Sequence, residues 1–335
     1  EVSMATEVQP LTVSQAINQA LQAHRAGKLE DAEAVYREVL VSAPDHPDAL
    51  HLLGVIAHQR GDSRQALRLI DRAIALDSNQ AHYYSNRGLA RRALGDVTGA
   101  RADYDRALSL QPNEAGAHHN LARLLHEQGD YDGAIEHYRR AIGGGLDTAE
   151  LYTQLGEALN AAGERYPAIA SFHHALVRMP EYLPAFRGFA IALAKIEGHE
   201  TDANLARRQV ERLTRNEAID SNELALFFFQ QARLLEDHGE RDLAVACLER
   251  SLSLRPHWAE AMTNLGVLLV NMGKLDDAIR YFGKAAGLRP ADPAIHRKLG
   301  WTLLAGGHVR DAECVYRRAI ELQPDSAIGW AGLAL

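Results

Sequence analysis

Six amide side chains recur at one position of a sequence that repeats about every 34 residues. They are Asn18, Asn86, Asn120 and Asn264, with Gln154 and Gln230 as longer equivalents. A primary amide donates and accepts hydrogen bonds at once, so a row of them can pair with the peptide groups of an extended chain. Leu52, Gly188 and Lys298 interrupt the row. We therefore predict recognition of a peptide backbone, with capping and bridging of neighbouring repeats as the alternative role for these amides.

Charged and aromatic side chains recur three or four residues from the amides, which places them on the same helix face. The candidate ligand contacts among them are Arg123, Arg187, Arg233, Arg297, Phe229 and Trp301. We expect Arg187 and Arg297 to meet an acidic segment of a ligand. Phe229 and Trp301 are the candidate aromatic anchors, because exposed aromatic residues often dominate binding energy. For Trp301, partial burial against the adjoining repeat is the alternative.

Histidines gather in the first half of the chain and could suggest metal binding. His24, His58 and His126 share one position of the repeat, and His51 and His119 share another. A zinc site needs three or four ligands that converge about 2 Å from one ion. Equivalent positions of adjacent packed helices are instead about 10 Å apart. We therefore expect solvated polar side chains and no metal site.

Motifs for other chemistry are missing from the sequence. We find no phosphate-binding loop, dinucleotide fingerprint, zinc-ligand spacing or Ser–His–Asp arrangement on a suitable strand, turn and helix. The run Gly143–Gly145 lacks the lysine of a phosphate loop and is predicted to be a turn. We expect no catalysis by this chain and no cofactor.

Composition limits the partners and the compartment. The net charge of −8 argues against a nucleic-acid partner, because that activity needs a clustered basic face. No apolar run approaches the roughly 18 residues of a membrane span, and no signal segment begins the chain. The only cysteines, Cys247 and Cys314, are predicted to be packed thiols without a disulfide. We expect no membrane insertion and a reducing cytoplasmic location.

A repeated unit must position all of these side chains. In one copy, Asn264-Leu265-Gly266 is followed by Gly273, Ala278, Phe282, Ala285 and Pro290, and the same spacing recurs from Gly300 to Pro324. Glycine suits the left-handed turn after a first helix, and a small alanine lets a second helix approach closely. Proline then prevents the second helix from continuing. A fixed period of roughly 20–50 residues indicates a solenoid of helical hairpins.

This pattern of Leu-Gly, Gly, Ala, an aromatic residue, Ala and Pro resembles the tetratricopeptide repeat over nearly the whole chain. The resemblance implies an all-α fold, a right-handed superhelical solenoid of about nine and a half helix-turn-helix repeats with a concave groove. The amide row is similar to the asparagine ladder of O-linked N-acetylglucosamine transferases. The chain as a whole resembles the repeat arms of bacterial multidomain proteins that carry glycosyltransferase, sulfotransferase or hydroxylase domains.

The repeat alignment also suggests boundaries. We predict a disordered leader at 1–12, an array at 13–198 that ends with the first helix of repeat six, and an array at 225–335 that ends in a truncated tenth repeat. Between them, residues 199–224 are predicted to be an atypical helix and a longer connection. The spacing grows there from 34 to 42 residues. A hinge and a rigid insertion are both compatible with that change.

The sequence predicts a protein-binding scaffold whose concave groove holds an extended peptide or a partner segment. The alternative is the non-catalytic recognition arm of a larger enzyme that continues after residue 335. Trp330 and Leu333 occupy first-helix core positions of a tenth repeat, so self-association through an uncapped carboxyl-terminal end is a further possibility.

Overall fold

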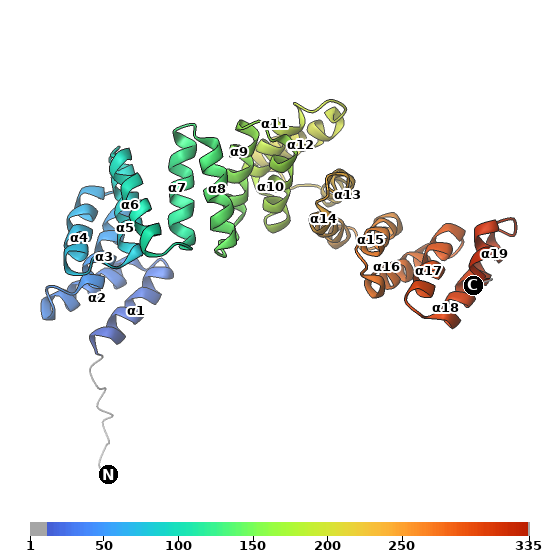
Figure 1. Ribbon diagram of the computed structural model, residues 1–335, viewed down its shortest axis with the longest axis horizontal. Coiled ribbons are helices and arrows are strands. Elements are labelled where there is room, and N and C mark those ends of the chain that lie inside the picture. The colour runs from blue at the N-terminus through green and yellow to red at the C-terminus, as the bar shows by residue number, and fades with distance from the viewer. Residues whose placement is uncertain (1–11, 334–335) are drawn as a thin grey trace, which may run out of the picture. The chain divides into compact units, whose positions relative to one another are not determined.

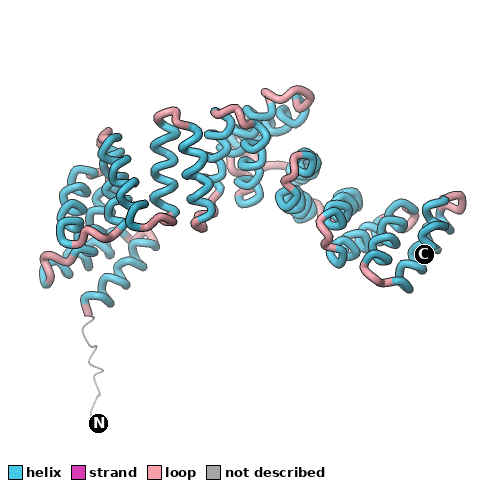
Figure 2. The backbone as a smooth tube through the Cα atoms, viewed as in Figure 1, coloured by secondary structure: helices cyan, strands magenta, loops and turns pink. Residues whose placement is uncertain are grey.

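The computed structural model describes residues 12–333, apart from the side chain of residue 328. Every regular element within this range is a helix, and the connections are short loops (Figures 1 and 2). The predicted leader at 1–12 lies outside the described residues except for Thr12. The chain forms two compact units, residues 1–147 and 148–335. The predicted boundaries at 198 and 224 both lie inside the second unit.

The helices follow one another as hairpins. The first unit contains α1 (Val13–Arg25), α2 (Leu29–Ser42), α3 (Pro47–Gln59), α4 (Ser63–Leu76), α5 (Ala81–Ala93), α6 (Val97–Leu110), α7 (Ala115–Glu127) and α8 (Tyr131–Gly143). The second contains α9 (Ala149–Ala161), α10 (Arg165–Arg178), α11 (Leu183–Leu193), α12 (Glu200–Thr214), α13 (Ser221–Asp237), α14 (Arg241–Leu254), α15 (Ala259–Asn271), α16 (Leu275–Leu288), α17 (Pro293–Ala305), α18 (Val309–Leu322) and α19 (Ala327–Leu333). The nine hairpins and one further helix of residues 12–333 confirm the predicted all-α repeat fold.

Local sequence signals define the helix ends. Thr12 forms a reciprocal capping box with Gln15 at the start of α1. Asp130 caps α8 by accepting a hydrogen bond from the Gly133 amide. Gly129, between α7 and α8, has φ of 79°. A side chain strains that left-handed conformation, so glycine is the residue that closes the hairpin without penalty.

Close packing within several hairpins depends on a glycine opposite an aromatic ring. A Cβ atom at Gly88 of α5 would lie only 2.5 Å from the Tyr104 ring of α6. Tyr104 itself is fully buried, and Tyr36 and Tyr138 occupy the same place in their own hairpins. Burial of one such side chain contributes about 1.5–3 kcal/mol. The glycine therefore allows the ring to fill the space between the two helices.

A buried ion pair joins α5 to α6 in the first unit. Asp103 is 2% exposed, and its carboxylate accepts hydrogen bonds from Arg87 at 2.6 and 2.9 Å. Arg91 lies 3.0 Å from the same carboxylate. Asp103 is therefore a buried charge on a second helix. Its two arginine partners compensate for the loss of water.

Repeat six departs from the regular hairpin. Helix α11 has 11 residues, and α13 has 17 where the regular first helix has 13. The added residues lengthen α13 and the loops on either side of α12, so they form both helix and loop.

Helices α13 and α14 pack on the preceding repeats at this place. Phe227 contacts Phe186 of α11 with ring centroids 5.3 Å apart, and Cys247 lies 3.9 Å from His173 of α10. Whether these contacts open as a hinge remains a prediction. Cys247 is buried as predicted, but Cys314 is exposed, because it lies on the solvent face of α18.

Candidate functional site

Two of the predicted amides connect neighbouring repeats in the first unit. Asn86 on α5 donates to His51 Nε2 of α3 at 2.8 Å. Asn120 on α7 donates to Ser85 Oγ of α5 at 3.4 Å. Each bond joins residues 35 positions apart, so a residue in one first helix meets its near-equivalent in the next. Such contacts favour the bridging alternative for Asn86 and Asn120, whereas Asn18 is exposed on α1.

Further polar bonds with the same spacing link the first helices of this unit. The Tyr83 hydroxyl donates to Asp48, and Arg92 pairs with Glu127. His24 and Gln59 lie 2.9 Å apart across α1 and α3. The predicted contact Arg123 is half-buried on α7. The polar side chains of this face are therefore largely engaged with one another.

His51 does not match the expectation of solvated groove histidines. It is 3% exposed and stacks on the Tyr83 ring at 4.6 Å. Burial, with a smaller contribution from the neighbouring imidazoles of His82 and His24, lowers the pKa of His51 to about 3. The expectation was wrong for His51 because the offset between adjacent first helices places Tyr83 over the imidazole. Burial also lowers the pKa of His173, which is fully buried on α10.

The histidines do not converge on a common point. His118 and His137 approach with their Nδ1 atoms 2.8 Å apart, and His118 Nε2 lies 2.9 Å from the Pro112 carbonyl oxygen. Across residues 12–333, no group of three or more histidine, cysteine, aspartate or glutamate side chains is arranged to hold a metal ion.

The second unit presents its amides differently. Gln154 donates to Glu150 one turn earlier on α9, at 3.0 Å. Gln230 on α13 and Asn264 on α15 are both exposed. The residue that would bridge to Asn264 by the 35-residue offset is Phe229, whose ring offers the amide no comparable hydrogen bond. Asn264 is therefore directed to a cavity instead of a neighbouring helix.

Two adjoining cavities lie along α13, α15 and α17. The first, of about 420 Å³, is lined by Phe229, Ala232, Arg233, Glu236, Asp237, Leu248, Asn264, Val267, Leu268 and Lys298. The second, of about 310 Å³, is lined by Val267, Val270, Phe282, Ala294, Arg297, Lys298, Trp301, Thr302 and Tyr316. Val267 and Lys298 belong to both linings, so the cavities form one continuous depression. We call it the α13–α17 groove.

The α13–α17 groove has an apolar end and a charged end. Trp301 is 53% exposed at the apolar end, where it lies near Val270. Arg297 lines the same cavity and donates to Gln323 at 2.8 Å. At the charged end, Arg233 is largely exposed and lies 3.9 Å from Asp237. The partial burial considered for Trp301 leaves about half of its surface accessible.

Phe229 lies deeper in the groove than the other candidate anchor. It is half-buried, and its ring lies 4.4 Å from the Trp258 ring in a tilted arrangement. Trp258 precedes α15 and is buried over the boundary between two repeats. Phe229 therefore forms part of the groove floor, and Trp301 is the more accessible aromatic surface.

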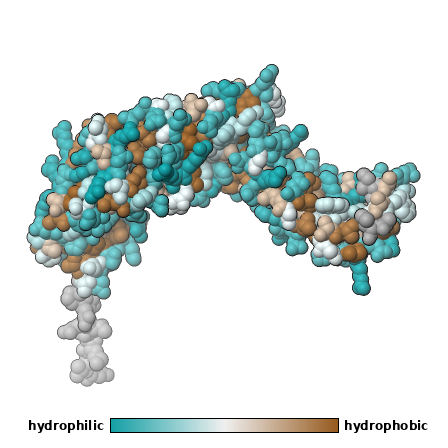
Figure 3. Space-filling model, in the orientation of Figure 1, coloured by the Kyte–Doolittle hydropathy of each residue, from teal (hydrophilic) through white to brown (hydrophobic). Residues whose placement is uncertain are grey.

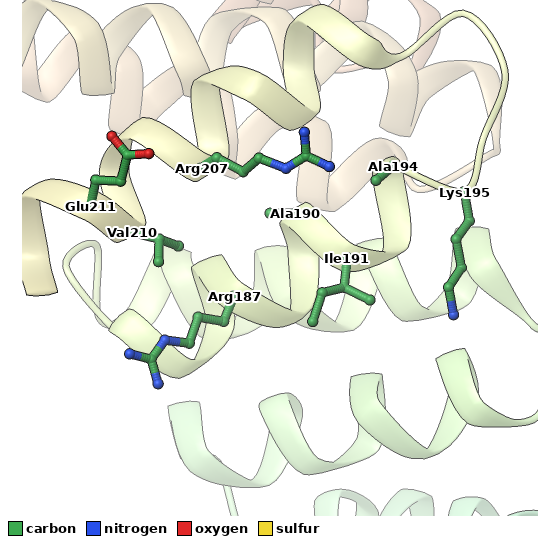
Figure 4. Close-up of a pocket in the computed structure, with 8 residues that line it drawn as sticks. All are labelled: Arg187, Ala190, Ile191, Ala194, Lys195, Arg207, Val210 and Glu211. Atoms are coloured by element: carbon green, nitrogen blue, oxygen red, sulfur yellow. The ribbon is translucent and has the colours of Figure 1, made fainter.

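Arg187 lies apart from the α13–α17 groove. It lines a third cavity, between α11 and α12, whose residues are shown in Figure 4. The sequence interpretation grouped all candidate contacts along one surface. The structure places Asn18, Asn86, Asn120 and Arg123 in the first unit and the other candidates in the second. On the face shown in Figure 3, hydrophobic residues form separate groups among hydrophilic ones in both units.

The repeats match known family models. One model described as "Tetratricopeptide repeat" matches residues 85–148, 119–173, 229–293 and 263–327. A second model with that description matches residues 23–88. These matches cover well over half of the chain. The chain belongs to the tetratricopeptide repeat family. Tetratricopeptide repeat proteins act as scaffolds for protein interaction. None of the helices between residues 12 and 333 is long and apolar enough to cross a membrane.

Curated relatives match this tetratricopeptide repeat chain locally. Tetratricopeptide repeat protein 36 of Mus musculus is 46% identical over 59 residues, which are 18% of this chain and 32% of that protein. Protein O-mannosyl-transferase TMTC1 of Homo sapiens is 31% identical over 81 residues, or 24% of this chain and 9% of that protein. The chain thus spans a third or less of the length of these two relatives.

Solved repeat structures are also similar. MamA from Desulfovibrio magneticus RS-1 is 21% identical, with 52% of this chain and 98% of that chain covered and a TM-score of 0.48. An O-GlcNAc transferase of Thermobaculum terrenum is 32% identical, with 38% of this chain and 26% of that chain covered and a TM-score of 0.37.

Sequence reasoning missed some of the lining of this tetratricopeptide repeat groove. Val267 and Val270 follow Asn264 on the same helix face, but the sequence analysis named only polar, charged and aromatic candidates there. Lys298 was treated as an interruption of the amide row, but it lies where the two cavities meet. The interruption itself was a usable signal, because a cation there changes which ligand groups can bind.

Proposed function

We propose that the α13–α17 groove binds an extended peptide or a partner segment and that the chain itself is non-catalytic. The observation that carries the proposal is the continuity of the two cavities, with Trp301 exposed at one end and Asn264 exposed in the other. A peptide can bury an apolar side chain against the indole while its backbone reaches the amide. Lys298, between them, would favour a carboxylate on the ligand.

The first unit contributes less to this proposed site. Asn86 and Asn120 already bond to neighbouring repeats, so each retains only part of its hydrogen-bonding capacity for a ligand. Asn264 keeps both its donor and its acceptor accessible. We therefore assign recognition of the peptide backbone first to Asn264, with Gln230 as the neighbouring exposed amide.

The test begins with capture of partners from a native lysate by the full chain, followed by mapping of the bound segment on peptide arrays. Affinity of the mapped peptide is then measured by fluorescence anisotropy. Trp301→Ala is expected to weaken binding about 30-fold, or roughly 2 kcal/mol for loss of an anchor. Asn264→Ala is expected to weaken it about five- to tenfold, the value of one hydrogen bond.

Two variants serve as controls. Val309→Ala removes an apolar side chain that is 56% exposed on α18, outside the groove, and should leave affinity unchanged. Asn86→Ala should alter stability more than affinity. If Trp301→Ala and Asn264→Ala both bind the peptide as tightly as the unmodified chain, the groove is not the binding site.

The alternative function is a recognition arm of a larger enzyme. Local similarity to a protein named as an O-mannosyl-transferase is compatible with repeats that serve an enzyme. The reading frame that encodes the chain separates the two proposals, because several hundred codons beyond Leu335 would favour the enzyme arm. Self-association through α19, where Trp330 is 55% exposed, also remains a prediction that light scattering can test.

A further inference from the structure

A cavity of about 490 Å³ lies between α11 and α12, apart from the α13–α17 groove. Its lining is Arg187, Ala190 and Ile191 of α11, Ala194 and Lys195 of the turn that follows α11, and Arg207, Val210 and Glu211 of α12. This volume falls in the range of about 300–1,000 Å³ that is typical of ligand sites. Figure 4 shows the two helices separated, with Arg207 extended between them.

The cavity exists because one large side chain is replaced. The ninth residue after the hairpin glycine faces the partner helix of its repeat in the regular hairpins. In chain order these residues are Tyr36, Ile70, Tyr104, Tyr138, Phe172, Arg207, Leu248, Phe282 and Tyr316. Eight are apolar or aromatic, and those on either side of repeat six, Phe172 and Leu248, are buried. In repeat six the residue is Arg207, which is exposed. A charged side chain cannot occupy that apolar space without loss of hydration, so the space stays open.

The floor and the rim of the cavity differ in character. Ala190, Ala194 and Val210 form an apolar floor, and Ile191 remains 53% exposed beside them. Binding becomes more favourable when a ligand covers this exposed isoleucine and removes it from water. The floor therefore suits a large apolar side chain.

The rim is basic on a chain that is acidic. Three cations, Arg187, Lys195 and Arg207, surround the cavity with one carboxylate, Glu211, in a chain whose net charge is −8. Arg207 donates to Asn204 at 3.1 Å. Within the described residues, Arg187 and Lys195 have neither a hydrogen bond nor an ion pair. Arg187 lies on α11, and Lys195 lies in the turn that follows this helix.

We propose that the α11–α12 cavity is a second docking site, for an acidic partner segment that inserts one large apolar side chain. The apolar side chain fills the space that an aromatic residue fills in the other repeats. Flanking carboxylates of the segment pair with Arg207 on the α12 side of the cavity and with Arg187 or Lys195 on the α11 side. This site is independent of the α13–α17 groove, because the two linings share no residue.

The probe is a random peptide library displayed on phage and selected against the full chain, with the Trp301→Ala variant selected in parallel. Both selections are expected to enrich peptides with a Leu, Ile, Phe or Met next to Asp or Glu. Synthetic copies of these peptides are then measured by fluorescence anisotropy at low and high salt. Binding should weaken as salt rises, because exposed charges are screened.

Two substitutions at one position test the site. Arg207→Glu reverses the charge and should weaken binding at least tenfold. Arg207→Phe restores the residue type of the other hairpins, so it should fill the cavity and also weaken binding at least tenfold. Arg207→Phe should keep or raise the thermal midpoint, because it adds buried apolar surface. A loss of binding with intact stability therefore cannot be attributed to unfolding.

Arg208→Glu is the matched control, because Arg208 is the exposed neighbour on α12 that does not line the cavity. Binding by this control should stay within about twofold of the unmodified chain. The proposal is overturned if selection enriches no acidic and apolar peptide. It is equally overturned if the enriched peptides bind both Arg207 variants as tightly as they bind the unmodified chain.

Discussion

Acid should destabilise the first unit through His51, and His51→Gln should remove that sensitivity. His51 on α3 is buried, and its Nε2 accepts a hydrogen bond from the Asn86 amide. The imidazoles of His82 on α5 and His24 on α1 further disfavour a proton on His51. The ring above it, Tyr83, donates its hydroxyl proton to Asp48 and is engaged there.

The magnitude follows from the pKa of His51, which burial lowers from the ordinary 6.5 to about 3. The unfolded chain takes up this proton below pH 6.5, but the folded chain does so only near pH 3. Stability is therefore complete above pH 6.5 and falls as the pH decreases toward 3. At pH 5 the difference of about 1.5 units costs ~2 kcal/mol, at 1.36 kcal/mol per unit.

The assay is urea unfolding of the full chain between pH 7.5 and pH 5, followed by circular dichroism. Other titrating groups contribute equally to the unmodified chain and to His51→Gln. The informative quantity is therefore the free energy of unfolding of the unmodified chain minus that of His51→Gln. This difference should shrink by ~2 kcal/mol on going to pH 5. The exposed His257 provides a control, because His257→Gln should keep the pH dependence of the unmodified chain. Parallel curves for the unmodified chain and His51→Gln would refute the reasoning.

Three further predictions concern packing, charge and access. Gly88→Ala places a Cβ 2.5 Å from a tyrosine ring and should lower the free energy of unfolding by about 1–3 kcal/mol. Gly283→Ala meets no atom within 4 Å and should stabilise the chain by up to ~1 kcal/mol. Thermal midpoints compare the two variants, and equal shifts would contradict the packing account. Asp103→Ala removes the buried carboxylate that Arg87 and Arg91 share, and it should cost about 3 kcal/mol in urea unfolding even though Arg87 keeps its pair with Asp71. A loss below about 1 kcal/mol would show that the shared carboxylate is not needed. A thiol reagent should label the exposed Cys314 at once, but Cys247 only after α14 separates from α10. Burial excludes solvent from the Cys247 thiol and raises its pKa. Rapid labelling of both cysteines would indicate a hinge between α10 and α14.

Much of the fold could be predicted from the sequence because its signals are local. Gly129 requires a left-handed turn, and Thr12 with Gln15 forms a capping box, so both act through residues within one helical turn. The pairing of Gly88 with Tyr104 repeats in the sequence and reports the contact between two helices of one hairpin. Each of these features depends on spacing along the chain, which a single sequence displays.

The candidate site could be predicted only in part, because side chains at one repeat position have different surroundings. Asn86 and Asn264 are equivalent in the repeat, yet the first bonds to His51 and the second lines a cavity. The difference comes from the residue one position earlier in the preceding repeat, a histidine in one case and Phe229 in the other. That neighbour is 35 residues away, and only the packing of adjacent first helices brings it into contact.

The sequence by itself determined the hairpin, its period and the residue type at each repeated position. Local turns and helix spacing act within a few residues, so these features follow from composition and order. The tertiary structure decided which of the repeated side chains remain accessible. It buries His51 beneath Tyr83, leaves Trp301 exposed, and opens the space beside Arg207. Accessibility depends on the offset between stacked helices and on which residues fill the space between them, and both are properties of contacts between repeats.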